Sequence, residues 1–196
     1  IQILLTAALV AASSFFGNFM KAGNWNNVLL PKPKIIEWTQ GKNHAICQEP
    51  QVTMVNDIPE AVCCKDEAYV LSIRDGKPEI KAITPLGVIR AKQTLAQVML
   101  GGNEVPNCVI TDWPEFSIRG FLQDIGRAYL PIEEIKAEID NLARFKVSVF
   151  HWHLTENQAW RFEVKAFPQL TSSESMTRLR GKYYTQEQCR EVMRYA

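Results

Sequence analysis

Hydrophobic and polar positions alternate along two neighbouring stretches of the chain, residues 68–73 (AYVLSI) and residues 79–83 (EIKAI). A period of two predicts strands that each bury one face, and the Asp-Gly-Lys-Pro segment between them predicts a hairpin turn. Residues 25–38 carry Pro31 and Pro33 between apolar residues, which favours an extended edge segment over a helix.

A helical spacing of apolar positions follows in residues 85–100, and this helix is expected to end at Gly101-Gly102. Its buried face is predicted to hold Ile89, Leu95, Val98 and Met99. Together with the hairpin, this helix predicts a small α+β domain over residues 24–111.

The pattern changes after Trp113-Pro114, where two short, largely apolar runs at residues 119–125 and 147–154 predict buried strands. Between them, Pro131 marks a helix start, and the acidic residues after it suit the positive end of the helix dipole. The buried face of that helix is predicted to hold Ile132, Ile135, Ile139 and Leu142.

Residues 155–157 are predicted to open a loop after the second strand, and residues 185–196 to form another helix. This order of strand, helix, strand, loop and helix is typical of parallel α/β folds with right-handed crossovers. A complete (β/α)8 TIM barrel takes about 250 residues. Residues 112–196 therefore predict the first two βα units of such a barrel, truncated on its C-terminal side.

The first stretch of the chain, residues 1–16, is apolar and rich in small residues near its end. This composition indicates a secretory signal peptide that lacks its basic beginning, so residues 1–23 are expected to be a clipped signal and linker. A buried helix and a membrane anchor are the alternatives, although a membrane span needs roughly 20 apolar residues. The protein is therefore expected to be exported to a periplasmic, extracellular or lysosomal location.

The charge of the chain limits the partners it is expected to bind, and its cysteine content indicates the state of its thiols. The 22 Lys and Arg residues against 21 Asp and Glu residues give a net charge of +1, which argues against a nucleic-acid or polybasic membrane surface. The five cysteines are an odd number without metal-ligand spacing, so mostly buried free thiols are expected.

Arg127 and Glu156 are the candidate site residues, because they follow the two predicted strands and βα loops gather at the carboxyl ends of parallel strands. A planar guanidinium can hold two neighbouring hydroxyl groups, and sugar rings stack on broad aromatic faces. The tryptophans near this position are Trp113, Trp152 and Trp160. The competing interpretation is a solvated surface ion pair between Arg127 and Glu156.

His151 and His153 are spaced so that both point to one face of a strand. Such a pair can ligate a metal, which would make the chain part of a metal-dependent hydrolase. Two histidines do not complete a site, and interior residues held by hydrogen bonds are the favoured interpretation.

Two longer motifs are specific. They are Arg119-Gly120 followed by residues 124–131 (DIGRAYLP), and then residues 150–161 (FHWHLTENQAWR). With residues 167–171, 181–186, 84–87 and 93–95, the chain resembles the family 20 β-N-acetylhexosaminidases from Asn24 onward. In that family a small α+β domain precedes a TIM barrel.

The resemblance implies a retaining hydrolase that removes terminal N-acetylglucosamine or N-acetylgalactosamine, with the acetamido oxygen of the substrate as nucleophile. It implies no cofactor, no metal and no nucleic acid. The catalytic Asp-Glu pair is expected on a later strand, beyond Ala196, so no catalytic residue is assigned in this chain. Arg127 matches the arginine that binds the outer sugar hydroxyls, and Glu156 matches an acid that supports the general acid through a downstream histidine.

The chain departs from the animal enzymes at three places. They carry two aspartates where this chain has Glu156-Asn157, and Ser and His flank the arginine where it has Gly126 and Ala128. The leading hypothesis is an N-terminal part of an exported β-N-acetylhexosaminidase that does not turn over substrate alone. A non-catalytic carbohydrate-binding module is the alternative.

Overall fold

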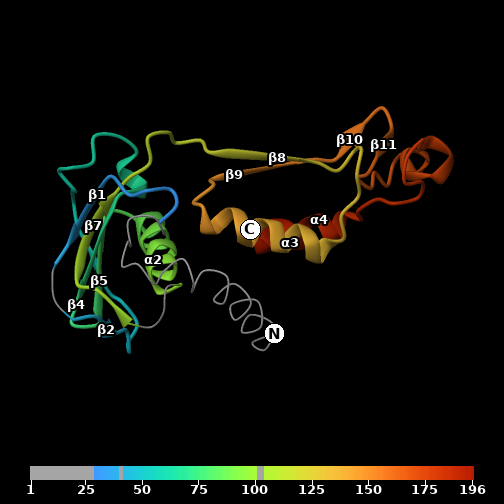
Figure 1. Cartoon of the computed structure of the whole chain (residues 1–196). Helices are drawn as coiled ribbons and strands as arrows, with labels where there is room; N and C mark the ends of the chain where they lie inside the picture. The colour runs from blue at the N-terminus through green and yellow to red at the C-terminus, as the bar shows by residue number, and fades with distance from the viewer. Residues whose placement is uncertain (1–28, 40–41, 101–103) are drawn as a thin grey trace. The chain divides into compact units, whose positions relative to one another are not determined.

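The computed structural model describes residues 29–39, 42–100 and 104–196, which form parts of two compact units, Ile1–Ser117 and Ile118–Ala196 (Figure 1). The predicted signal segment, residues 1–23, lies outside the described residues. Within the described ranges, no helix is both long and apolar enough to cross a membrane.

The first unit is built on a five-stranded sheet with the order β1-β7-β4-β5-β3. Its strands are β1 (Ile35–Trp38), β3 (Gln51–Met54), β4 (Tyr69–Arg74), β5 (Lys77–Ala82) and β7 (Cys108–Asp112). Only β3 and β5 run parallel; the other neighbouring pairs are antiparallel. The described part of this unit also contains a short pair, β2 (His44–Ala45) and β6 (Glu104–Val105), and the helix α2 (Pro85–Met99).

The predicted hairpin is confirmed as β4 and β5, and the predicted edge segment contains β1 at one end of the sheet. The hairpin turn has positive φ at both central residues, 50° at Asp75 and 73° at Gly76. This backbone suits the right-handed twist of paired strands, and glycine adopts it without strain. A Cβ on Gly76 would also lie 2.1 Å from the Ala45 carbonyl oxygen, so no larger residue fits.

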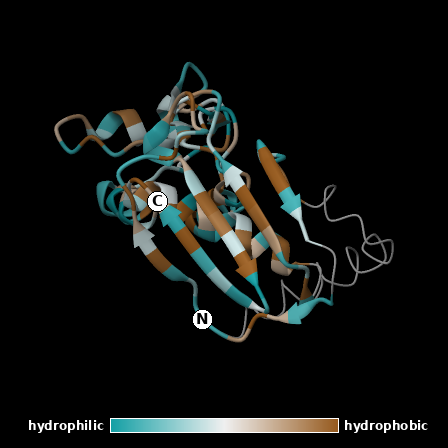
Figure 2. Ribbon diagram, turned by 90° about the vertical axis from the view of Figure 1, so that its left-hand side faces the viewer, coloured by the Kyte–Doolittle hydropathy of each residue, from teal (hydrophilic) through white to brown (hydrophobic). Residues whose placement is uncertain are grey.

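The core of this unit lies between the sheet and α2. One face of β4 and β5 is buried, and hydrophobic and hydrophilic bands along the strands of this sheet reflect the alternation (Figure 2). Its buried members include Tyr69, Leu71, Ile73, Ile80, Ala91, Leu95 and Val98. The prediction for Ile89 is wrong, since it is 50% exposed. It precedes Leu95 by six residues, which is not a whole number of helical turns.

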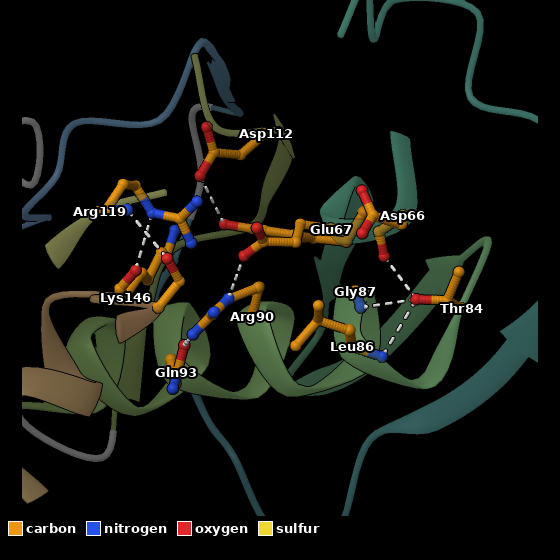
Figure 3. Close-up of polar contacts among 12 residues, drawn as sticks. Asp66, Glu67, Thr84, Leu86, Gly87, Arg90, Gln93, Asp112, Arg119 and Lys146 are labelled. Atoms are coloured by element: carbon orange, nitrogen blue, oxygen red, sulfur yellow. Dashed lines mark hydrogen bonds and ion pairs between the residues drawn. The ribbon is translucent and has the colours of Figure 1, made fainter. Parts of the chain in front are cut away.

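Polar contacts fix the start of α2 against the 3-10 helix η3 (Lys65–Glu67) (Figure 3). The Thr84 hydroxyl accepts hydrogen bonds from the backbone N–H groups of Leu86 and Gly87 and donates to the Asp66 carbonyl oxygen. One turn further, Arg90 Nε donates to Glu67 Oε2 at 2.6 Å, and both side chains are buried. The N-cap and the ion pair therefore hold η3 and α2 together.

The second unit contains two βα units. The strand β8 (Gly120–Asp124) runs parallel to β9 (Val149–His153), and α3 (Ile132–Arg144) connects them. The helix α4 (Gln186–Tyr195) follows β9 after a long connection, which contains β10 (Thr155–Glu156), β11 (Ala159–Trp160) and the 3-10 helices η4 (Pro168–Thr171) and η5 (Ser173–Ser175). The predicted parallel arrangement is confirmed. The prediction that a loop begins at residues 155–157 is wrong in part, because β10 and β11 form a small antiparallel hairpin.

The core of the second unit lies between one face of the two strands and the two helices. Ile135 of α3 and Val192 of α4 are buried there, and Ile132 and Ile139 pack against them from the predicted face. A capping box between Thr185 and Gln188 begins α4. All five cysteines are free thiols as expected, but Cys47 is exposed and only Cys108 and Cys189 are buried, so the prediction of mostly buried thiols is wrong.

Candidate functional site

The carboxyl ends of β8 and β9 bring the two predicted site residues together. Asp124 and His153 are paired in the parallel register, and the next two backbone N–H groups, of Ile125 and Gly126, donate to the His153 carbonyl oxygen. This turn directs Arg127 toward Glu156, which lies just beyond β9. The candidate site is therefore set by the pairing of the two strands.

Arg127 lies between two carboxylates. Its Nη1 donates to Asp124 Oδ2 at 2.5 Å, and its Nη2 donates to Glu156 Oε1 at 2.7 Å. The Arg127 backbone N–H also donates to Asp124 Oδ1 at 3.1 Å. The Arg127 side chain is 52% exposed, against 25% for Asp124 and 22% for Glu156. The acids thus orient the guanidinium while one side of it stays open to solvent.

Asp124 is a site residue that the sequence reasoning did not single out. The hydrogen bond from the Arg127 backbone N–H, reinforced by the Arg127 side chain and by the charge of His153, lowers the pKa of Asp124 below its ordinary value. A carboxylate that stays ionised holds the guanidinium more strongly. The available signal was its position, an acid at the end of a strand and three residues before the arginine.

Glu156 is held by its hairpin and by its neighbours. It is paired with Ala159 in the β10–β11 ladder, and the Asn157 backbone N–H donates to its Oε2 at 3.1 Å. His153 Nε2 lies 3.4 Å from Glu156 Oε1. Gly126 faces the same side chain, and a Cβ there would lie 2.7 Å from Glu156 Cβ. The bare glycine makes room for the glutamate.

His151 and His153 lie on one face of β9 as predicted, with ring centroids 5.8 Å apart. Across the described ranges, no group of three or more His, Cys, Asp or Glu side chains is arranged to hold a metal ion. His153 instead belongs with Glu156 and Asp124 at the strand ends.

Sequence comparisons match two domain models to most of the chain. "Glycosyl hydrolase family 20, domain 2" matches residues 28–113, and "Glycosyl hydrolase family 20, catalytic domain" matches residues 116–196. The chain belongs to glycosyl hydrolase family 20. The domain-2 match contains the five-stranded sheet and α2, and the catalytic-domain match contains Arg127 and Glu156.

Individual family 20 proteins resemble the chain over most of its length. A beta-hexosaminidase of Porphyromonas gingivalis is 39% identical over 155 residues, 71% of this chain and 20% of that protein. One of Vibrio furnissii is 38% identical over 147 residues, 66% of this chain and 24% of that protein. The structure of a GH20 exo beta-N-acetylglucosaminidase from Vibrio harveyi, in complex with N-acetylglucosamine, has a TM-score of 0.70 and 26% identity over 86% of this chain and 34% of that one. The chain thus spans about a fifth to a third of these relatives.

Two of the three tryptophans predicted as sugar platforms of this family 20 chain are placed elsewhere. Trp113 is 9% exposed and packs with Ile58, Ala61 and Ala68 in the first unit. Trp152 packs against the Tyr184 ring at 4.7 Å in the helix-facing core, because alternation along β9 turns it away from His153. Of the three, only Trp160, at 36% exposed, retains an open face.

Arg161 is a second residue of this family 20 chain that the sequence reasoning missed. It is fully buried, and its guanidinium donates to the Ile125 carbonyl oxygen at 2.6 Å. It donates as well to three carbonyl oxygens of the long connection, those of Arg178, Leu179 and Lys182. Arg161 therefore ties that connection to the backbone between Asp124 and Arg127.

Proposed function

We propose that this chain forms the sugar-orienting part of a β-N-acetylhexosaminidase, which removes terminal N-acetylglucosamine or N-acetylgalactosamine from glycans. The observation that carries the proposal is Arg127, fixed between Asp124 and Glu156 at the carboxyl ends of β8 and β9. Its placement within the match to the family 20 catalytic domain supports the proposal. So do the relatives, which are named beta-hexosaminidases, and the related structure that holds N-acetylglucosamine.

Arg127 has the geometry to bind neighbouring hydroxyl groups. A guanidinium carries five N–H donors in one plane, and its contacts with Asp124 and Glu156 use one donor of each Nη. The remaining donors lie on a side chain that is half exposed. A sugar that presents two adjacent hydroxyl groups would meet a donor fork whose orientation is already set, which reduces the entropy lost on binding.

The proposed reaction is retaining hydrolysis assisted by the substrate's own acetamido group. Glu156 would act as a positioning residue, which orients Arg127 directly and supports the general acid through a histidine. The Asp-Glu pair proposed to orient the acetamido group and protonate the leaving oxygen is not assigned to any residue of this chain. The chain's own contribution is thus recognition of the outer sugar ring. The export proposed from residues 1–23 would bring it to extracellular or lumenal glycans.

The test uses the whole protein that contains this chain and a chromogenic N-acetylglucosaminide. Arg127→Lys keeps the charge but loses the planar fork, so we expect KM to rise about tenfold or more, the loss of one good ligand hydrogen bond. Arg190→Lys, on the exposed side of α4, is the matched control and should leave KM unchanged. Hydrolysis that is indifferent to Arg127→Lys would overturn its assigned role. Binding of N-acetylglucosamine without hydrolysis would favour the carbohydrate-binding module instead.

A further inference from the structure

Two adjacent cysteines in the first unit, Cys63 and Cys64, are not used by the proposed function. Both are free thiols, and both are half-buried in the connection between β3 and β4. Neither residue lies in a helix or a strand: Cys63 is in a bend, and Cys64 directly precedes the 3-10 helix η3. Adjacent residues in an extended strand point their side chains to opposite faces, and this pair departs from that arrangement.

The backbone on both sides of the pair is anchored. Cys64 is the N-cap of η3 and has the left-handed backbone, with φ of 46°. Two residues of η3 are tied to α2, Asp66 through its carbonyl oxygen and Glu67 through its ion pair with Arg90 (Figure 3). These contacts hold Cys64 in a fixed position.

Cys63 is anchored on its other side. Its thiol donates to the Pro114 carbonyl oxygen at 3.4 Å, and it packs against the hydrophobic cluster of Ile58, Ala61, Ala68 and Trp113. The chain leaves β7 through Trp113 and Pro114. The Cys63 thiol therefore links the connection before η3 to the segment that follows β7.

We propose that Cys63 and Cys64 form a reversible redox site, which reacts with a small-molecule disulfide such as glutathione disulfide. The thiolate of one cysteine attacks the small-molecule disulfide, forms a mixed disulfide and releases one thiolate. The neighbouring cysteine, after it loses its proton, attacks the protein-bound sulfur and releases the second. Two cysteine thiols and one small disulfide thus become one protein disulfide and two small thiols, so that the cysteines are oxidised and the reagent is reduced.

Geometry makes such a bridge easily reversed. The Cα atoms of adjacent residues are about 3.8 Å apart across a trans peptide bond, whereas bridged cysteines usually lie about 4.4–6.8 Å apart. A bridge under this strain is more readily reduced than a structural disulfide. Its formation also removes the Cys63 donor from the Pro114 carbonyl oxygen, so the redox state of the pair controls one contact of the segment after β7.

Burial, together with the Cys63 thiol, raises the pKa of Cys64. Because the thiolate is the reacting form, ring closure should speed up as the pH rises toward that pKa.

The experiment treats the full chain with glutathione disulfide and maps the products by mass spectrometry after trypsin digestion. Residues 43–65 form one tryptic peptide that also holds Cys47, so the background carries Cys47→Ser. We expect this peptide to lose two hydrogens and carry no glutathione. In Cys63→Ser and Cys64→Ser, made in the same background, the remaining cysteine should retain a glutathione adduct, about tenfold more than the pair does, because the partner that closes the ring is gone.

Reduced glutathione should restore the dithiol in the Cys47→Ser background. A second probe, phenylarsine oxide, condenses with two neighbouring thiols and releases water, and should label the pair but neither single variant. Far-UV circular dichroism checks that each variant is folded. Stable glutathione adducts on the pair at the level of the single variants, or no reaction at the pair with either reagent, would overturn the proposal.

Discussion

Replacing Arg161 by lysine tests whether one buried guanidinium organises the second unit. Arg161 is fully buried and donates to four carbonyl oxygens at 2.6–3.2 Å, one on Ile125 and three on residues 178–182. A lysine keeps the charge but has a single nitrogen with three donors, which cannot reach all four oxygens. Since a hydrogen bond to a charged group contributes about 1.5–3 kcal/mol, losing one or two costs about 2–5 kcal/mol.

The assay is a urea titration of the full chain, read by far-UV circular dichroism and by hydrogen exchange. Arg161→Lys should lower the unfolding midpoint of the second unit and raise exchange at residues 176–184, because that connection loses its anchor. The first unit should keep its exchange pattern. The control, Arg190→Lys, changes an arginine that is 57% exposed and should stay within about 0.5 kcal/mol of the unmodified chain.

The reasoning would be refuted if Arg161→Lys and Arg190→Lys unfolded at the same urea concentration. It would also fail if the added exchange were spread evenly over both units, since the contacts of Arg161 described above all lie in the second unit.

Three further predictions concern single side chains. Gly126→Ala should destabilise the second unit by about 1–3 kcal/mol in a urea titration, because the added Cβ overpacks against Glu156. Gly120→Ala, whose Cβ would meet nothing closer than 3.9 Å, should cost less, and equal costs would contradict the prediction. The lowered pKa of Asp124 means that its stabilisation is present above the ordinary aspartate pKa and is lost as the pH falls through the lowered pKa. The urea midpoints of Asp124→Asn and the unmodified chain should therefore converge as the pH falls below the ordinary aspartate pKa, and a constant gap would argue against it. Arg90→Met removes the buried guanidinium that donates to Glu67 and should lower the thermal stability of the first unit more than Lys65→Met, which breaks an exposed pair and should cost under about 1 kcal/mol. A reversed order would count against the burial argument.

The elements with a clear period were predictable from the sequence. Residues 68–73 and 79–83 are short alternating runs on the two sides of an Asp-Gly turn, and the structure places β4 and β5 there. The parallel pair β8 and β9 followed from two apolar runs separated by a helix of regular spacing. The hairpin of β10 and β11 was not predictable, because strands of two residues are too short to show a period.

The environments of single side chains were harder to predict. Trp113 and Trp152 were expected to offer open faces, but an aromatic residue type does not reveal whether its ring packs into a core. Arg161 lies in a polar stretch and resembles a surface residue in the sequence. Its burial depends on carbonyl groups 17–21 residues further along and on Ile125, 36 residues before it. The binding roles of Arg127 and Glu156 stay predictions, although the structure brings the two together.

The side chain of Glu156 occupies space that is free only because residue 126 is a glycine. By the resemblance drawn from the sequence, the animal family 20 enzymes carry a serine and an aspartate at these positions, and from the sequence alone the two differences look independent. In the structure Cβ and Cγ of Glu156 occupy the space in which a side chain at residue 126 would stand, at 2.7 and 2.9 Å from an ideal Cβ. The glutamate therefore crosses a residue without a side chain and still contacts Arg127 at 2.7 Å. The glutamate contacts Arg127 because residue 126 has no Cβ, so a side chain at residue 126 and this conformation of Glu156 exclude each other.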